Sequence, residues 1–295
     1  MTERSYILPP RKLLRITGED KRSFLQGLIS NDIEKVTPER AIWAALLTAQ
    51  GKFLHDFFIA EMDDAFLLAG EAERIDDLKR RLSMYKLRAR VALEIAEGWQ
   101  VALAYGAEAL AALDLPAEPG AARRFGGGVA FVDPRLAEAG ACLFLPDLAP
   151  LAAAGFQPGD QAGHERLRIS LGLPDGSRDM QVDKAILLEN GFDELHGVDW
   201  KKGCYVGQEL TARTKYRGLI KKRLMPVAID GPSPEAGAII LLGDREAGEM
   251  RSAEDGQGLA LIRLEALQNL QESGESALRV GDTRLTPRKP GWAGF

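Results

Sequence analysis

Cysteine and histidine are scarce in this sequence. Its 295 residues include two cysteines, Cys142 and Cys204, and three histidines, His55, His164 and His196. Two cysteines so far apart do not form the disulfide framework of a small secreted protein. The histidines are scattered, and a structural metal site needs about four ligands. Any metal bound through Cys204 would therefore be shared with a second protein. A reducing cytoplasm is the location we expect.

Long hydrophobic runs are also missing. The longest apolar stretches, such as 44–49 and 142–145, are far shorter than the roughly 20 residues that span a membrane. The first residues resemble neither a signal peptide nor a transit peptide. The formal net charge of −5 argues against general binding to nucleic acid. The glycines form no phosphate-binding or dinucleotide-binding pattern. We therefore expect no membrane partner and no nucleic-acid partner.

The chain is long enough for two or three domains. Up to about residue 215, predicted strands are mixed with amphipathic helices, which indicates an α+β body. From 222 onward, short apolar segments are separated by Gly, Pro and Asp turns, which is typical of a small β-sandwich or barrel. The predicted organisation is an α+β domain at 1–215 followed by an all-β domain at 222–295.

Hydrophobic periodicity predicts the individual elements. The run 17–20 has a hydroxyl cap with an acid three residues on, and predicts a helix that ends near 30–32. An apolar stripe predicts a longer helix over 71–88. Short helices are predicted at 107–113, 148–155 and 162–171. Strands are predicted at 11–16, 43–48, 53–60, 65–69, 91–95, 99–104, 129–133 and 142–145, the last burying Cys142, and then at 224–229, 238–242, 246–252, 258–263, 277–280 and 283–287.

The most unusual segment runs from Lys201 to Arg223. It holds eight Lys or Arg residues and a single acid, Glu209, so its net charge is +7 in a protein whose total is −5. A local positive region on an acidic protein is typical of a site for an anionic ligand. Because the segment also contains Cys204, the sequence predicts a small anion held beside a thiol.

Two interpretations of Cys204 are open from chemistry alone. Glycines on both sides allow a tight backbone and the close approach of a ligand. Residues 208–216 are good helix formers, so the thiol would lie just before a helix N-terminus. There Lys201, Lys202 and the helix would stabilise a thiolate. The alternative is a small, inert cysteine buried in a basic loop.

The same predicted helix carries charged residues at a spacing of four. Glu209, Arg213 and Arg217 would share one helix face. A solvated Glu–Arg ladder is the common interpretation of this spacing. The functional interpretation is an arginine pair that binds a carboxylate.

A catalytic nucleophile at Cys204 would need a neighbouring base. His196 has no evident orienting partner, so we do not expect this role.

A family resemblance becomes specific at the cysteine segment. Residues 202–209, Lys-Gly-Cys-Tyr-Val-Gly-Gln-Glu, followed by Leu-Thr-Ala-Arg, resemble the signature of the YgfZ-type folate-binding proteins. These proteins belong to the superfamily of the glycine-cleavage T-protein, an aminomethyltransferase. The segments 23–32, 46–56 and 187–202 resemble three further parts of the family pattern. The resemblance covers nearly the whole chain, and it points to the iron–sulfur assembly factors of bacteria and mitochondria.

The resemblance implies a folate-binding body of two interleaved α+β parts and a small C-terminal β-barrel. It implies tetrahydrofolate in a central channel, with the Glu189 carboxylate at the donor-rich pterin edge. Arg213 and Arg217 would lie near the two carboxylates of the glutamate tail, and Tyr205 and Trp200 would line the rings. The folate-binding residues that it implies are Glu189, Lys202, Tyr205, Arg213, Arg217 and Asn31.

The chain also departs from the transferase branch of this superfamily. That branch carries paired acids where this sequence has His55 and Asp56, and it lacks the cysteine motif. Leu187 replaces a usual proline and leaves Glu189 in place. We therefore expect a tetrahydrofolate-binding accessory protein of iron–sulfur cluster assembly or repair rather than an enzyme. Cys204 would be its reactive thiol, or a ligand to a transient cluster shared with an A-type scaffold protein or a client enzyme. The alternatives are a folate-dependent aminomethyl or methyl transferase and a tRNA-modification factor.

Overall fold

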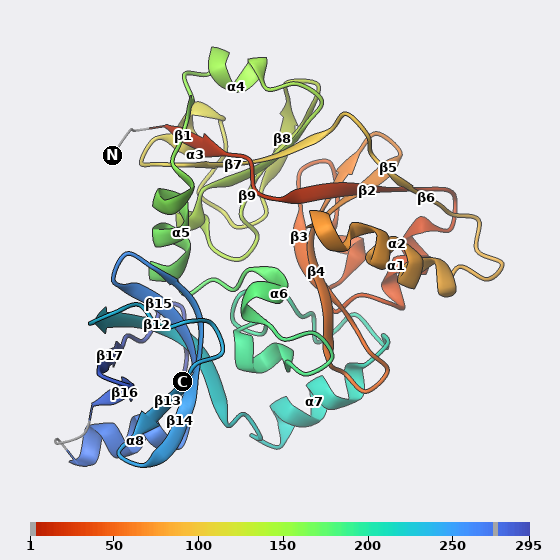
Figure 1. Cartoon of the computed structure of the whole chain (residues 1–295). Coiled ribbons are helices and arrows are strands. Elements are labelled where there is room, and N and C mark those ends of the chain that lie inside the picture. Colours follow the sequence, from red (N-terminus) through yellow and green to blue (C-terminus); the bar gives the residue numbers. More distant parts are fainter. Residues whose placement is uncertain (1–3, 274–276) are drawn as a thin grey trace. The chain divides into compact units, whose positions relative to one another are not determined.

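The computed structural model describes residues 4–273 and 277–295 (Figure 1). Contacts divide this described chain into two compact units. The first unit comprises residues 4–49, 54–161 and 195–208, and the second comprises 50–53, 162–194 and 209–295. Each unit is thus assembled from segments that are distant in the sequence. Cys204 belongs to the first unit and Glu189 to the second.

The first sheet of the first unit has the strand order β3-β4-β5-β2-β6. Its central hairpin, β4 and β5, was predicted from the sequence and pairs Ile59 with Leu68. The observed strands are β2 (Arg11–Thr17), β3 (Ile42–Leu47), β4 (Phe53–Met62), β5 (Ala65–Glu71) and β6 (Ala92–Ile95). Nearly every residue of β3, β4 and β5 is buried, which places these strands at the centre of the core.

The second sheet of this unit has the order β11-β1-β7-β10-β9-β8. Its strands are β1 (Ser5–Ile7), β7 (Gln100–Tyr105), β8 (Ala122–Phe125), β9 (Gly128–Val132), β10 (Ala141–Leu145) and β11 (Gln157–Pro158). The ring of Phe131 packs edge-on against Phe144 at 5.0 Å and against Phe58 of the first sheet at 6.2 Å. The two sheets therefore share an aromatic contact in the core. Cys142 is fully buried in β10, as predicted.

The first two helices of the first unit are shorter than predicted by several residues. The cap expected at Thr17 is wrong, because Thr17 ends β2 and the helix begins after Asp20, whose carboxylate accepts a hydrogen bond from the Arg90 backbone instead. The helix stops early because the Ser30 backbone N–H pairs with β3. The second helix ends before Leu87, whose φ of 42° is left-handed. The observed helices and 3₁₀ turns are α1 (Lys21–Gln26), η1 (Ile33–Lys35), η2 (Ala72–Arg74), α2 (Ile75–Met84), α3 (Ala109–Ala112), η3 (Ala137–Ala139) and α4 (Ala149–Ala153).

The second unit contains a closed barrel of order β12-β15-β14-β13-β16-β17. Its strands are β12 (Lys222–Asp230), β13 (Ile239–Leu242), β14 (Arg245–Glu254), β15 (Gln257–Arg263), β16 (Leu278–Val280) and β17 (Thr283–Pro287). All six correspond to predicted strands, and closure confirms the predicted barrel. The expectation of an all-β region is wrong at α8 (Leu264–Ser273). There Leu264, Leu267 and Leu270 recur every three residues, which is a helical spacing.

The second unit also contains the segment 162–194, which packs on the barrel. Ile169 clusters with Leu224, Leu259 and Leu261. The buried Arg168 guanidinium pairs with Glu165 and Asp179, and these carboxylates raise its pKa. The remaining helices are α5 (Gln161–Ser170), α6 (Gly176–Asp179), η4 (Leu187–Asn190) and α7 (Gln208–Tyr216). Helix α7 begins at the predicted residue. Across the described ranges, no helix has the length and apolarity needed to span a membrane.

Candidate functional site

Cys204 lies on a tight, solvent-exposed loop just before α7. The flanking Gly203 and Gly207 have φ angles of 90° and 81°. Such left-handed conformations favour glycine, because a side chain there is strained. The loop therefore needs both glycines to turn around the thiol. The structure confirms that the thiol precedes a helix, and the exposure of Cys204 contradicts the alternative of a buried cysteine.

The buried side chain of Lys202 anchors this loop to the interior of the first unit. Its ammonium donates to the carbonyl oxygens of Ile29 at 2.6 Å and Asn31 at 2.8 Å, and it lies 5.2 Å from the ring centre of Tyr205. Burial lowers the pKa of Lys202 to about 8, although Asp32 acts against this shift. Two of the three donors of the ammonium are thus used within the protein. Lys202 fixes the backbone two residues before Cys204.

The end of α1 holds the loop on both sides of the thiol. Gln26 donates its amide to the Lys202 carbonyl oxygen at 3.1 Å, before Cys204. The Val206 backbone N–H donates to the Gly27 carbonyl oxygen at 3.1 Å, after Cys204. These bonds join segments more than 170 residues apart in the sequence. The conformation around Cys204 is therefore set by tertiary contacts as well as by its glycines.

Asn31 supports the same region from inside the first unit. Its side-chain N–H₂ donates to the carbonyl oxygens of Trp43 at 2.8 Å and His196 at 2.7 Å, and its oxygen accepts from the Asp32 backbone N–H. Both N–H donors of the amide are engaged with backbone, and the side chain is buried. The structure thus brings together Asn31, Lys202, the buried Tyr205 and Cys204. It gives Asn31 and Lys202 internal partners.

Glu189 lies in η4 of the second unit and is half-buried. Within residues 4–273 and 277–295, its carboxylate has no hydrogen-bond or ion-pair partner. Burial raises its pKa, against the opposing charges of four cations, Lys222, Lys52, Arg223 and Arg251. Because both oxygens remain available in a positive field, this carboxylate can accept hydrogen bonds from a ligand that carries two adjacent donors.

The turn around Glu189 is braced by a buried arginine. The Arg223 guanidinium donates to the carbonyl oxygen of Leu188 and to the Asp193 carboxylate at 3.2 Å, and it pairs with Glu194 at 3.2 Å. Asn190 donates its amide to the Ile186 carbonyl oxygen at 3.0 Å, which closes the turn. Arg223 is the last residue of the basic segment, and no local signal in the sequence distinguishes it from a surface arginine.

The two remaining predicted residues lie at the end of α7, with Arg213 inside the helix and Arg217 in the turn directly after its last residue. Arg213 pairs with Glu209 at 2.6 Å on the exposed helix face, so the ladder is present there. Arg217 is exposed and has no acidic partner in the described part of the chain. Lys202 and Arg223 are buried, so these two cations of the basic segment are not part of an exposed surface for an anion. The charge of this segment is divided between internal anchors and exposed side chains.

His55 and Asp56 replace the acid pair of the transferases and point to opposite faces of β4. The His55 ring lies 2.9 Å from Asp77 of α2, and burial lowers its pKa to about 4. Asp56 accepts a hydrogen bond from the Trp43 indole at 3.0 Å and lies 3.9 Å from the Arg11 guanidinium. Both side chains are almost fully buried. They are therefore core residues, and His55 is neutral at pH 7.

The side chains of the described residues form no group of three or more His, Cys, Asp or Glu that could hold a metal ion.

Sequence reasoning missed several residues that shape the two candidate sites. Gln26 lies inside the matched segment 23–32 but gave no signal of its own. Lys52 and Arg251 come from distant parts of the chain, and only the fold brings them near Glu189.

Comparisons with known proteins agree on fold and family. Residues 221–295 match the family model described as the CAF17 C-terminal beta-barrel domain. The mitochondrial iron–sulfur cluster assembly factor IBA57 of Mus musculus is 33% identical over 281 residues, which covers 88% of this chain and 78% of that protein. The Homo sapiens protein of the same name is 32% identical over 282 residues, with 88% and 78% covered.

The solved structure of the glycine cleavage system aminomethyltransferase T from Bartonella henselae shares the fold. It superimposes with a TM-score of 0.76 at 14% identity, covering 99% of this chain and 86% of that chain. An identity this low supports the fold alone. The closed barrel and the α+β body agree with this fold, and the two IBA57 relatives identify the family. The chain belongs to the IBA57 family of iron–sulfur cluster assembly factors.

Proposed function

We propose that this protein binds tetrahydrofolate and assists iron–sulfur cluster assembly or repair, in the manner of the YgfZ-type proteins. In this proposal Cys204 contacts the cluster, which is the cargo rather than a resident cofactor. The observation that carries the proposal is an exposed thiol on a loop fixed on both sides. The relatives named iron–sulfur cluster assembly factors support this role.

The exposure of Cys204 suits a ligand shared between proteins. Iron–sulfur clusters are commonly held by four cysteine thiolates, so one thiolate supplies only a part of the ligand set. A partner, either an A-type scaffold protein or a client enzyme, would supply the others. An exposed loop can approach such a partner without rearrangement, because Lys202 and Gln26 already fix its backbone. A reducing compartment would keep Cys204 available as a thiol.

The residues around Glu189 fit tetrahydrofolate. The pterin edge presents adjacent N–H donors, and the half-buried Glu189 carboxylate has two free acceptor oxygens among the described contacts. The glutamate tail carries carboxylates, which a guanidinium binds through paired hydrogen bonds. Arg217 is exposed for this purpose, whereas Arg213 is already paired. Lys202 and Asn31 would position the Cys204 loop rather than hold folate, because their polar groups already have internal partners.

The same structure favours an accessory role over aminomethyl transfer. A transferase needs acidic or basic groups directed at the reacting atoms. His55 and Asp56 instead lie in the core, with Asp77 and Trp43 as partners. Folate would therefore be sensed or stored rather than consumed at these two residues.

The cluster role is tested by anaerobic reconstitution with iron, sulfide and an A-type scaffold protein. We expect the wild-type mixture to show thiolate–iron absorption bands that depend on both proteins. Cys204→Ala should remove the bands that depend on this chain, with no change in unfolding temperature, because the side chain is exposed. The matched control is Cys142→Ala, which changes a buried thiol and should keep the bands. Full bands with Cys204→Ala would disprove the thiol role.

The folate role is tested separately by calorimetric titration with tetrahydrofolate. Glu189→Gln should weaken binding by about tenfold or more, because hydrogen bonds to a charged acceptor contribute about 1.5–3 kcal/mol. Cys204→Ala should bind folate like the wild type. An unchanged dissociation constant for Glu189→Gln would contradict the pterin assignment and leave the cluster role standing.

A further inference from the structure

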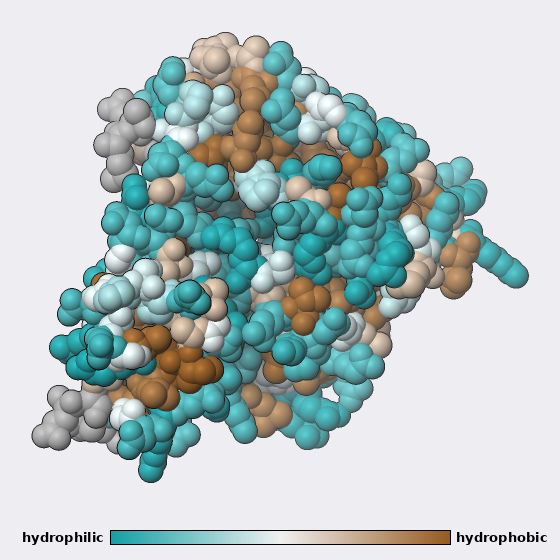
Figure 2. Space-filling view, viewed as in Figure 1, coloured by the Kyte–Doolittle hydropathy of each residue, from teal (hydrophilic) through white to brown (hydrophobic). Residues whose placement is uncertain are grey.

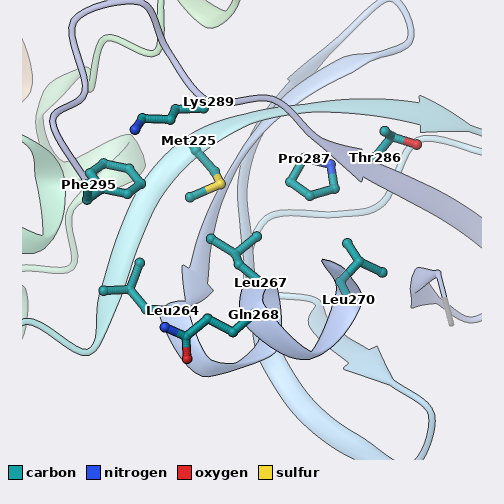
Figure 3. Close-up of a pocket in the computed structure, with 9 residues that line it drawn as sticks. All are labelled: Met225, Leu264, Leu267, Gln268, Leu270, Thr286, Pro287, Lys289 and Phe295. Carbon is teal, nitrogen blue, oxygen red and sulfur yellow. The ribbon is translucent and has the colours of Figure 1, made fainter. Parts of the chain in front are cut away.

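A cavity in the second unit is separate from the Cys204 loop and the Glu189 turn. It lies between α8 and the barrel strands β12 and β17, and its volume is about 630 Å³ (Figure 3). Cavities of roughly 300–1,000 Å³ are typical of small-molecule sites. The proposed folate and cluster residues do not line it. The cavity therefore needs an explanation of its own.

The wall of the cavity is almost entirely apolar. Leu264, Leu267 and Leu270 of α8 face Met225 of β12 and Pro287 of β17 (Figure 3). The three leucines are only half-buried, so part of their apolar surface stays open. Hydrophobic side chains also reach the surface over the barrel (Figure 2). An apolar chain that filled this space would remove that surface from water, which is favourable.

One charge stands at the mouth of the cavity. Lys289 is exposed, and among the described residues that line the space it is the only one with a charged side chain. Its ammonium lies 5.5 Å from the ring centre of Phe295, beside which it is drawn in Figure 3. Arg223 lies 4.9 Å from the same ring but is neutralised by Asp193 and Glu194. Lys289 has no carboxylate partner in the described residues.

We infer that this cavity binds a single-chain aliphatic carboxylate. The hydrocarbon chain lies between the α8 leucines and Met225, and the carboxylate lies at Lys289. An apolar interior with one unneutralised cation at its rim matches a molecule with an apolar body and one anionic end. This inference does not depend on the proposed role in cluster assembly.

The test is a titration with decanoate, followed by NMR of protein labelled with ¹³C at the methionine methyl groups. The Met225 methyl lines the cavity and should shift saturably. The Met84 methyl is exposed in the first unit and serves as the control. It should not shift, because a shift there would indicate non-specific binding of decanoate. Leu267→Trp, which fills the cavity, should weaken binding at least tenfold.

The headgroup is tested with a matched pair of variants. Lys289→Met should weaken decanoate binding about threefold and leave the binding of decan-1-ol unchanged. Arg288→Met removes the neighbouring exposed cation that does not line the cavity, and should leave decanoate binding within about twofold. The inference fails if Met225 shows no saturable shift or if Leu267→Trp binds decanoate like the wild type. Equal loss for decanoate and decan-1-ol in Lys289→Met would refute the carboxylate.

Discussion

The loop that carries Cys204 and the turn that carries Glu189 are both braced by a buried cation that donates to backbone carbonyls. In the first, Lys202 donates to Ile29 and Asn31. In the second, Arg223 donates to Leu188 and is neutralised by carboxylates. A main chain held in this way keeps the neighbouring functional side chain in place without binding it directly.

The two regions differ in what they present. Cys204 is an exposed thiol, open to a partner as large as a protein. Glu189 is a half-buried carboxylate in the field of four cations, suited to a ligand small enough to reach it. Because of this difference, the Cys204 loop and the Glu189 turn need not bind the same molecule. Changes to one anchor should therefore affect one activity and spare the other.

The largest effect is expected from the anchor of the Glu189 turn. Arg223→Met removes a buried guanidinium and leaves Asp193 and Glu194 unpaired, which should cost about 3–5 kcal/mol of unfolding free energy. Urea unfolding measures this loss. Tetrahydrofolate binding should fall, while cluster bands that depend on Cys204 persist in protein that remains folded. Arg279→Met is the control, because it changes an exposed barrel arginine and should cost less than about 0.5 kcal/mol.

A smaller effect is expected from the anchor of the Cys204 loop. Lys202→Met leaves two backbone carbonyls without their donor and should cost about 2 kcal/mol near pH 7. Cluster bands should weaken and folate binding should persist. Lys201→Met alters the exposed neighbour and serves as the control. Equal loss of folate binding and cluster bands in Lys202→Met would break the division between the two regions.

The lowered pKa of Lys202 predicts the direction in which the unfolding free energy changes with pH. Its pKa is about 8 in the folded protein, below the ordinary value of 10.5. Between these values the unfolded chain holds a proton that the folded chain has released. The unfolding free energy of the wild type should therefore rise with pH over this interval, by at most about 1.4 kcal/mol per pH unit. Lys202→Met should lack this rise, and parallel curves for the two proteins would contradict the assignment.

Much of the fold follows from local patterns in the sequence. The six barrel strands were predicted because short apolar runs alternate with turn residues. Helix α8 was missed because its ten residues sit among strands, and the regional pattern outweighed a local helical spacing. The first helix was predicted too long, because its sequence does not show that Ser30 pairs with β3. Local propensity fails where a distant segment competes for the same backbone.

The site was predictable only in part, for a related reason. The position of Cys204 before a helix follows from its glycines and from the helix formers after it. The burial of Lys202 does not, because its acceptors belong to residues about 170 positions away. A basic run looks the same in the sequence whether its members are exposed or internal. Of the two arginines predicted to bind folate, Arg213 is paired with Glu209 and Arg217 has no acidic partner in the described chain.

The smallest effect is expected at the exposed end of α7, where Arg213 of the helix and Arg217 of the following turn have different partners. Arg213 is paired with Glu209, and Arg217 has no acidic partner in the described chain. Arg217→Ala should weaken tetrahydrofolate binding about threefold, as expected for an exposed ion pair, and Arg213→Ala should change it less. The effect of Arg217→Ala should shrink as salt is added, because exposed charges are screened. A larger loss for Arg213→Ala would mean that its pair with Glu209 opens for the ligand. Unchanged binding in both variants would place the glutamate tail elsewhere and reduce the folate site to the Glu189 turn.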